Sequence, residues 1–201
     1  MFMAFAFVLL LLSVPPAGGH LALLGELRLR FSGLIVVSLA LQVLMTSVFP
    51  DAPHPVLIGL HLTSYVTIAF ALWVNRRLPG LLIIAVGGGT NAAVIALNGG
   101  TLPASAGALR EAGYTVDPSQ FKNSGVVVHP VLPWLGDIAA TPAWLPFRNV
   151  VSIGDAVILI GAAVLLHVTC RSRIHHALCL RRPAHELSTP DCVVEPSRSR
   201  P

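Results

Sequence analysis

The chain has few charged side chains. Of its 201 residues only 11% are charged and 54% are hydrophobic, whereas about a quarter of residues are charged in a typical soluble domain. Apolar runs of about 20 residues recur, and a helix of that length crosses the hydrocarbon core of a bilayer. The composition therefore argues against an ordinary soluble domain and predicts a polytopic helical membrane protein.

Several common site signatures are also missing. The run Gly87–Thr90 is followed by no lysine and lacks the spacing of a phosphate-binding loop. The three cysteines, Cys170, Cys179 and Cys192, lie at or beyond the end of the last apolar run, where we expect reduced thiols. Cys170 and Cys179 flank a pair of histidines, but this spacing fits no common zinc pattern. We therefore expect no metal and no cofactor.

Five apolar runs are long enough, or nearly so, to cross a membrane as helices. They are Phe2–Ala17, Phe31–Phe49, Pro55–Val74, Gly80–Leu97 and Val150–Val168. The first run resembles the apolar part of a signal peptide, but it lacks the basic segment that precedes one, so we expect it to be retained. The predicted fold is an all-α transmembrane bundle of about five spans.

The basic residues predict which end of the bundle faces the cytoplasm. Ten of the 13 Lys and Arg residues follow the first, third or fifth run, and short loops rich in these residues stay cytoplasmic. The other three, Arg110, Lys122 and Arg148, lie between the fourth and fifth runs. The N-terminus is therefore predicted outside and the C-terminus inside. Because topology explains the basic residues, the net charge of +4 does not indicate nucleic-acid binding.

Two parts of unequal size are expected. Residues 1–170 form the transmembrane bundle, and residues 171–201 form a basic cytoplasmic tail, partly disordered. The bundle includes a long outer loop, residues 98–148, with a short helix over 104–112 and several segments broken by proline. Trp134 and Trp144 are expected at the level of the lipid headgroups. The loop is predicted to be either a lid over the bundle or an interfacial tether.

A carboxylate lies in the last apolar run. Asp155 follows Asn149 by six residues, which places it about 9 Å inside the predicted helix. An ionisable side chain at the centre of a membrane costs at least about 2.5 kcal/mol, so it normally faces protein or water and has a partner. This cost favours a functional role for Asp155.

Three other spans carry a polar side chain at the same depth. Gln42, His61 and Asn91 each lie about 9–10 Å from the outer end of their helix, and Ser152 lies within a turn of that level. The sequence therefore predicts a buried polar layer beneath the outer loop. In this layer the partner of the Asp155 carboxylate is His61 or a side-chain amide of Asn91 or Gln42.

The polar layer also has a purely structural interpretation, because polar side chains commonly join membrane helices through modest hydrogen bonds. The fourth span ends at Asn98, Gly99 and Gly100, and two interpretations stay open there. The segment either stops the helix or offers backbone amides to an anion at the outer mouth of the bundle. We keep these three residues as candidate binding residues.

Small residues in the fourth span predict close helix contact. Gly88 and Ala92 form one small-x3-small pair, and Gly89 and Ala93 form another.

Three motifs carry a resemblance to a known family. They are Asn98–Gly99–Gly100–Thr101–Leu102–Pro103, Trp134–Leu135–Gly136–Asp137 and Val151–Ser152–Ile153–Gly154–Asp155. From the first span to about Leu166, the chain resembles an uncharacterised family of small bacterial multispan membrane proteins, known only as a domain of unknown function. That family often has Met where this chain has Leu102. The resemblance implies the architecture and marks residues, but it implies no activity and no ligand.

Three classes of function stay open for a multi-pass protein of the cell membrane. The first is binding of a small molecule or ion in an outward-facing pocket, where transport would require a homo-oligomer because five spans are few for it. The second is a structural or regulatory subunit of a membrane complex. The third is an intramembrane or lipid-modifying enzyme with Asp155 or His61 as general base.

Overall fold

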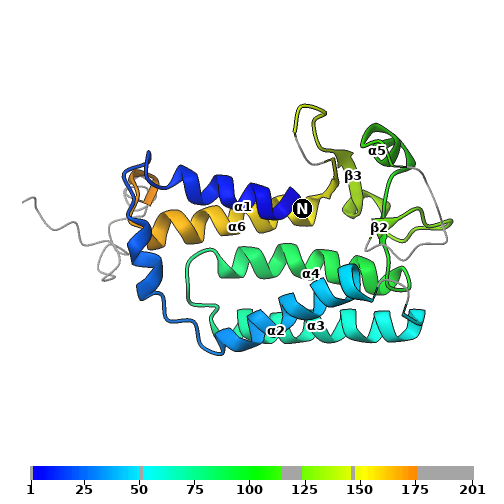
Figure 1. The fold of residues 1–201 in the computed structure, drawn as a ribbon, viewed down its shortest axis with the longest axis horizontal. Coiled ribbons are helices and arrows are strands. Elements are labelled where there is room, and N and C mark those ends of the chain that lie inside the picture. The colour runs from blue at the N-terminus through cyan, green and yellow to red at the C-terminus, as the bar shows by residue number, and fades with distance from the viewer. Residues whose placement is uncertain (1, 50–51, 115–123, 146–147, 176–201) are drawn as a thin grey trace, which may run out of the picture.

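Five long helices lie side by side and are covered at one end by a small cap (Figure 1). The computed structural model describes residues 2–49, 52–114, 124–145 and 148–175. The helices are α1 (Phe2–Ser13), α2 (Ser32–Val43), which continues as the π-helical turn η2 (Leu44–Val48), α3 (His54–Val74), α4 (Leu81–Leu97) and α6 (Ile153–Thr169). A short 3-10 helix, η1 (Leu21–Glu26), joins α1 to α2.

The helices pack in the order α1, α6, α4, α3, α2. Each long helix lies where an apolar run predicts one. By length and composition, however, α3 alone among the described helices could cross a membrane, and the others are shorter apolar helices of 10–17 residues. The chain is therefore mostly helical, and the number of spans is not fixed by helix length.

Glycines bring α4 and α6 into close contact. Gly87 of α4 faces Gly154 of α6, and seven residues away on each helix Gly80 faces Gly161. A Cβ atom built on Gly87 would lie 2.6 Å from the backbone oxygen of Gly154, and one on Gly161 would lie 2.8 Å from that of Gly80. These two backbones therefore approach more closely than side chains would allow.

The predicted small-x3-small pairs involve the wrong glycines. A Cβ atom on Gly88 or on Gly89 would meet nothing within 4 Å, so neither residue packs against another helix in the described chain. The helix turns by about 100° per residue, so only one of three adjacent glycines faces α6. That glycine is Gly87.

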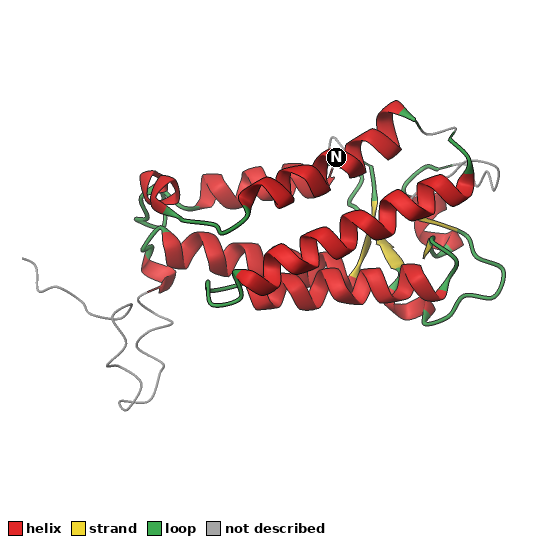
Figure 2. Ribbon diagram, turned by 90° about the horizontal axis from the view of Figure 1, so that it is seen from below, coloured by secondary structure: helices red, strands yellow, loops and turns green. Residues whose placement is uncertain are grey.

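The cap contains strands, which the all-α prediction did not include. Strand β1 (Leu102–Pro103) pairs in parallel with β2 (Ser124–Gly125), and β3 (Asp137–Ala140) pairs antiparallel with β4 (Val150–Ser152). Figure 2 shows these strands in yellow across one end of the bundle. The cap also contains α5 (Ala106–Glu111), where a short helix is predicted, and the 3-10 turn η3 (Pro133–Leu135).

A small apolar core holds the cap together. It consists of Ala104, Ala108, Leu109, Ala112 and Val150, with Ala140 packed against it. The Tyr114 hydroxyl donates a hydrogen bond of 2.8 Å to the carbonyl oxygen of Arg148, which ties the end of α5 to the segment before β4. The described part of the outer loop is therefore folded around this small core.

At the end of the bundle opposite the cap, a buried histidine joins α6 to α1 and to the segment that follows α6. His167 of α6 lies between two hydroxyls, with Nε2 3.2 Å from Ser13 Oγ of α1 and Nδ1 3.0 Å from Ser172 Oγ. Cys170 nearby is a buried free cysteine. The predictions for Cys179, Cys192 and most of the tail lie outside the described residues.

Candidate functional site

Asp155 lies in the first turn of α6. The sequence predicts a helix from Val150, but Val150–Ser152 pairs with β3 as a strand and α6 begins at Ile153. Ser152 is the N-cap residue: its hydroxyl accepts a hydrogen bond from the Asp155 amide at 3.0 Å, and Asp155 Oδ2 accepts one from the Ser152 amide at 3.1 Å. This reciprocal capping box places the carboxylate at the positive end of the helix dipole, which stabilises its charge.

Asn91 of α4 is the partner that the carboxylate requires. Its amide nitrogen donates to Asp155 Oδ1 at 2.9 Å, and its amide oxygen accepts from Ser152 Oγ at 3.0 Å. Asn91 and Ser152 are both buried. The three residues therefore form a closed hydrogen-bonded ring between α4 and α6, in which backbone amides make the Ser152–Asp155 links, and the predicted contact of Asp155 with Asn91 is present.

The other two polar residues of the predicted layer lie on the α2–α3 side. The Gln42 amide donates to Ser64 Oγ at 3.4 Å, and Ser64 Oγ donates to the carbonyl oxygen of His61 at 2.8 Å. Ser38 Oγ donates to the carbonyl oxygen of Ser64 at 2.8 Å. Gln42 therefore joins α2 to α3 and is not bonded to Asp155.

The ring of His61 is buried without a hydrogen bond to the described residues. It is 2% exposed, and neither ring nitrogen has a hydrogen-bond partner among the described residues. Its ring stacks on Tyr65, with the two centroids 4.8 Å apart. The Tyr65 hydroxyl interacts electrostatically with the Asp155 carboxylate. Of the three alternative partners predicted for Asp155, Asn91 is therefore bonded to it and His61 is not.

Asp137 is a site residue that sequence reasoning missed. It is the last residue of the Trp134–Asp137 motif, it pairs with Ser152 across the β3–β4 ladder, and it is only 4% exposed. Burial raises the pKa of Asp137 to about 6, the nearby Asp155 carboxylate contributes to the increase, and the Ser124 hydroxyl offsets part of it. The Ser124 hydroxyl lies near the carboxyl group, but neither Asp137 Oδ1 nor Ser124 Oγ has a partner in hydrogen-bonding geometry within the described chain. The repeated Gly–Asp pair in the two motifs was the available signal.

The three sequence motifs meet at this site. A Cβ atom on Gly154 would overlap the side-chain oxygen of Asn91, and one on Gly136 would overlap the carbonyl oxygen of Pro103. Each glycine therefore permits a close approach that any side chain would block. In both motifs an aspartate follows the glycine directly, as Asp137 after Gly136 and as Asp155 after Gly154. Each motif therefore places a carboxyl group next to a close contact between two segments.

Asn98, Gly99 and Gly100 end α4 and hold the cap. The Gly100 amide donates to the carbonyl oxygen of Ile95 at 2.9 Å, and both glycines have positive φ, as a helix stop requires. The Asn98 side chain forms two hydrogen bonds with the backbone of Val131, at 2.8 and 2.9 Å. These contacts support the helix stop, and they leave the Gly100 amide unavailable to an anion.

In the described part of the chain, no group of three or more His, Cys, Asp or Glu side chains is placed to hold a metal ion.

The sequence matches the model of a family of unknown function, DUF5317, over residues 26–167. No curated protein and no solved structure matches the chain. The matched range contains the cap, four of the long helices and all three motifs.

Proposed function

Since the chain belongs to DUF5317, a family of unknown function, we propose that it is a multi-pass protein of the cell membrane. We further propose that it binds a small positively charged ligand or ion in the polar site beneath its cap. The observation that carries the second part is a buried carboxylate, Asp137, near a second, half-buried carboxylate, Asp155, with no cationic side chain against either in the described chain.

Exposed apolar side chains support a membrane location. Large hydrophobic residues are exposed on all five long helices, and Val66 in the middle of α3 is 70% exposed. Exposure of apolar surface to water costs roughly 25 cal/mol of free energy per Å², whereas contact with lipid has no such cost. Helices of 17 residues span only about 26 Å, a mismatch that a bilayer accommodates by thinning.

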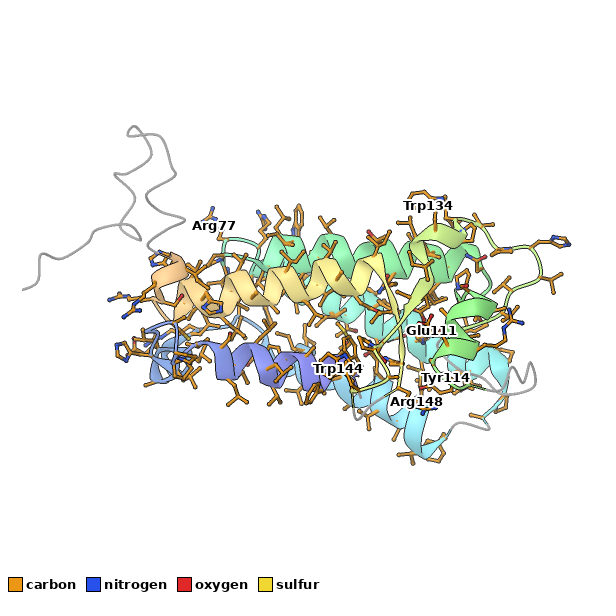
Figure 3. The ribbon with its side chains drawn as sticks, turned by 90° about the horizontal axis from the view of Figure 1, so that it is seen from above. Arg77, Glu111, Tyr114, Trp134, Trp144 and Arg148 are labelled. Carbon is orange, nitrogen blue, oxygen red and sulfur yellow. The ribbon has the colours of Figure 1, made fainter. Side chains whose placement is uncertain are left out.

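The ends of the bundle differ in charge as a membrane topology requires. Figure 3 shows Arg77 at the end opposite the cap, with Glu111, Trp134 and Arg148 on the cap side. At the Arg77 end, Arg76 stacks on Trp73 with its guanidinium 4.4 Å from the ring centroid. Exposed tryptophans at both ends match the two aromatic belts of a membrane protein, and the arginine-rich end is the one that stays cytoplasmic.

The charge of the site supports a cationic ligand. A buried carboxylate without a counter-ion is costly, and a second carboxylate nearby adds repulsion. Asp155 has its hydrogen-bonded ring, but Asp137 Oδ1 has none. A cation at this position would lower the energy of both groups.

Labelling of single cysteines tests the topology. In a variant whose three native cysteines are replaced by alanine, we expect a membrane-impermeant maleimide to label Val128→Cys in intact cells. Val128 is 85% exposed on the cap. Arg77→Cys should react only after the cells are permeabilised. Labelling of Arg77→Cys, but not Val128→Cys, in intact cells would invert the proposed orientation.

Thermal unfolding in detergent tests the binding site. At about pH 8 and equal ionic strength, NaCl, KCl and methylammonium chloride are compared with the bulky N-methylglucamine chloride. A cation present at ten times its Kd should stabilise the protein by about 1.4 kcal/mol, or roughly 3–6 °C in Tm. Asp155→Asn should abolish this increase, whereas Glu111→Gln, which alters an exposed acid of α5, should retain it. An equal Tm in all four salts would contradict the proposal.

A second candidate is the structural or regulatory subunit. The observation that favours it is the closed ring of Asn91, Ser152 and Asp155, which joins α4 to α6 without a ligand. In that case Asp155→Asn should lower Tm equally in every salt, because only helix packing is lost. A role of Asp155 or His61 as a catalytic base stays a prediction.

A further inference from the structure

We propose that Asp137 is the proton-exchanging group of this site, that it releases its proton to the outer medium, and that Asp155 of the hydrogen-bonded ring is its neighbour. The proposal rests on the proposed binding site and names the ion that the site exchanges.

The two carboxyl groups have different surroundings, and this difference indicates which of them exchanges the proton. Asp155 accepts hydrogen bonds from the Asn91 amide and the Ser152 backbone, and it lies at a helix N-terminus. These contacts all stabilise a negative charge. Asp137 lies on a strand, has a buried oxygen atom without a donor, and interacts electrostatically with the Asp155 charge. Asp137 is therefore the less stabilised of the two acids, and it is the one on which a proton is expected.

Other titratable groups near β3 do not change this assignment. Of the groups on α3, the Tyr65 hydroxyl interacts with Asp155, and His61 stacks on Tyr65. On α5, which packs against β3, Arg110 and Glu111 are exposed to solvent. Desolvation is the largest cause of the raised pKa of Asp137, at about 6, and no cationic group contributes to it.

A cavity of the cap lies beside the residue that follows Asp137. This residue, Ile138, lines a half-open cavity of about 310 Å³ together with Pro103, Ser105 and Trp134. A β-bulge interrupts the ladder between Asp137 and Ala139. The cavity therefore brings the outer medium to the next residue of β3, while Asp137 itself is buried.

Infrared difference spectroscopy on the full chain tests the proposal. Spectra at about pH 8 and about pH 4.5 are subtracted, which isolates the C=O stretch of carboxyl groups that gain a proton. We expect the wild type to show a carboxylic acid band that titrates near pH 6, as the pKa of Asp137 requires. The band should be lost in Asp137→Asn and retained in Glu111→Gln.

Two further measurements make the result decisive. Asp155→Asn should move the titration of Asp137 to lower pH, because it removes the neighbouring carboxylate. An unchanged titration in this variant would show that Asp137 and Asp155 do not interact. If the variant does not fold, Asn91→Asp provides an added charge beside the pair, and the titration should move to higher pH. A wild-type protein with no band near pH 6, or a band that persists in Asp137→Asn, would overturn the proposal.

The same samples separate this proposal from the broader one. The protein could show the band that titrates near pH 6 and also an equal Tm in all salts. This result would support proton exchange by Asp137 and reject the binding of a larger cation. A salt-dependent Tm without the band would retain the binding site and reject Asp137 as its proton carrier. A titration that moves to lower pH in NaCl, compared with N-methylglucamine chloride, would show a competing metal cation on Asp137 and support both.

Discussion

Gly87→Ala should destabilise the protein strongly, whereas the same change at Gly88 or Gly89 should stabilise it. A Cβ atom on Gly87 would lie 2.6 Å from the backbone oxygen of Gly154 and 2.9 Å from the backbone nitrogen of Ile158. Backbone atoms cannot rotate away as a side chain can, so α4 and α6 must separate. Overpacking of a core typically costs about 1–3 kcal/mol and occasionally more, and we expect about 3 kcal/mol here, or a decrease in Tm of roughly 6–12 °C.

The two neighbouring glycines provide a matched control. A Cβ atom on Gly88 or Gly89 meets nothing within 4 Å, and alanine favours a helix over glycine by up to about 1 kcal/mol. Each control should therefore raise Tm by roughly 2–4 °C in the same detergent. Equal effects at all three positions would show that α4 and α6 do not meet at Gly87.

The separation of the two helices should also disrupt the site. Gly87 lies one turn before Asn91, and Gly154 lies directly before Asp155, so the closest approach of α4 and α6 sets the 2.9 Å hydrogen bond between the two side chains. Gly87→Ala should therefore weaken binding at the site as well as stability. The glycines position the ring, and the ring holds the carboxylate.

The apolar runs of the sequence predicted the helices well because burial in lipid or protein requires long apolar segments. Depth along antiparallel helices also predicted the contact of Asn91 with Asp155. Depth alone does not determine which way a side chain points around its helix, and for that reason the predicted contact of His61 with Asp155 is wrong. The rotation of α3 places His61 against Tyr65 instead.

The start of α6 could not be predicted from local sequence. Val150 and Val151 continue an apolar run, and either a helix or a strand suits them. The strand forms because Asp137–Ala140 pairs with it, and the folding of the cap brings that segment into place. The same pairing buries Asp137, about whose burial the sequence made no prediction.

Asp137→Asn should stabilise the protein at neutral and alkaline pH and have little effect near pH 4. Burial raises the pKa of Asp137 from 3.8 to about 6 in the folded protein, so the folded state holds a proton that the unfolded chain has lost. Stability from this group is therefore fully present below about pH 4 and decreases as pH rises to about 6. A pKa difference of this size corresponds to about 3 kcal/mol. The amide that replaces the Asp137 carboxyl group in the variant carries no charge, so this cost disappears.

The measurement is Tm in detergent at about pH 4, 6 and 8 for the wild type, Asp137→Asn and the control Glu111→Gln. The variant curve should be flatter than that of the wild type and should lie above it by roughly 6–12 °C at the highest pH. The control should follow the wild type, because Glu111 is exposed in both states. Parallel curves for the wild type and Asp137→Asn would mean that water or an ion reaches the Asp137 carboxylate in the folded protein. The pKa of Asp137 would then not be raised in the folded protein.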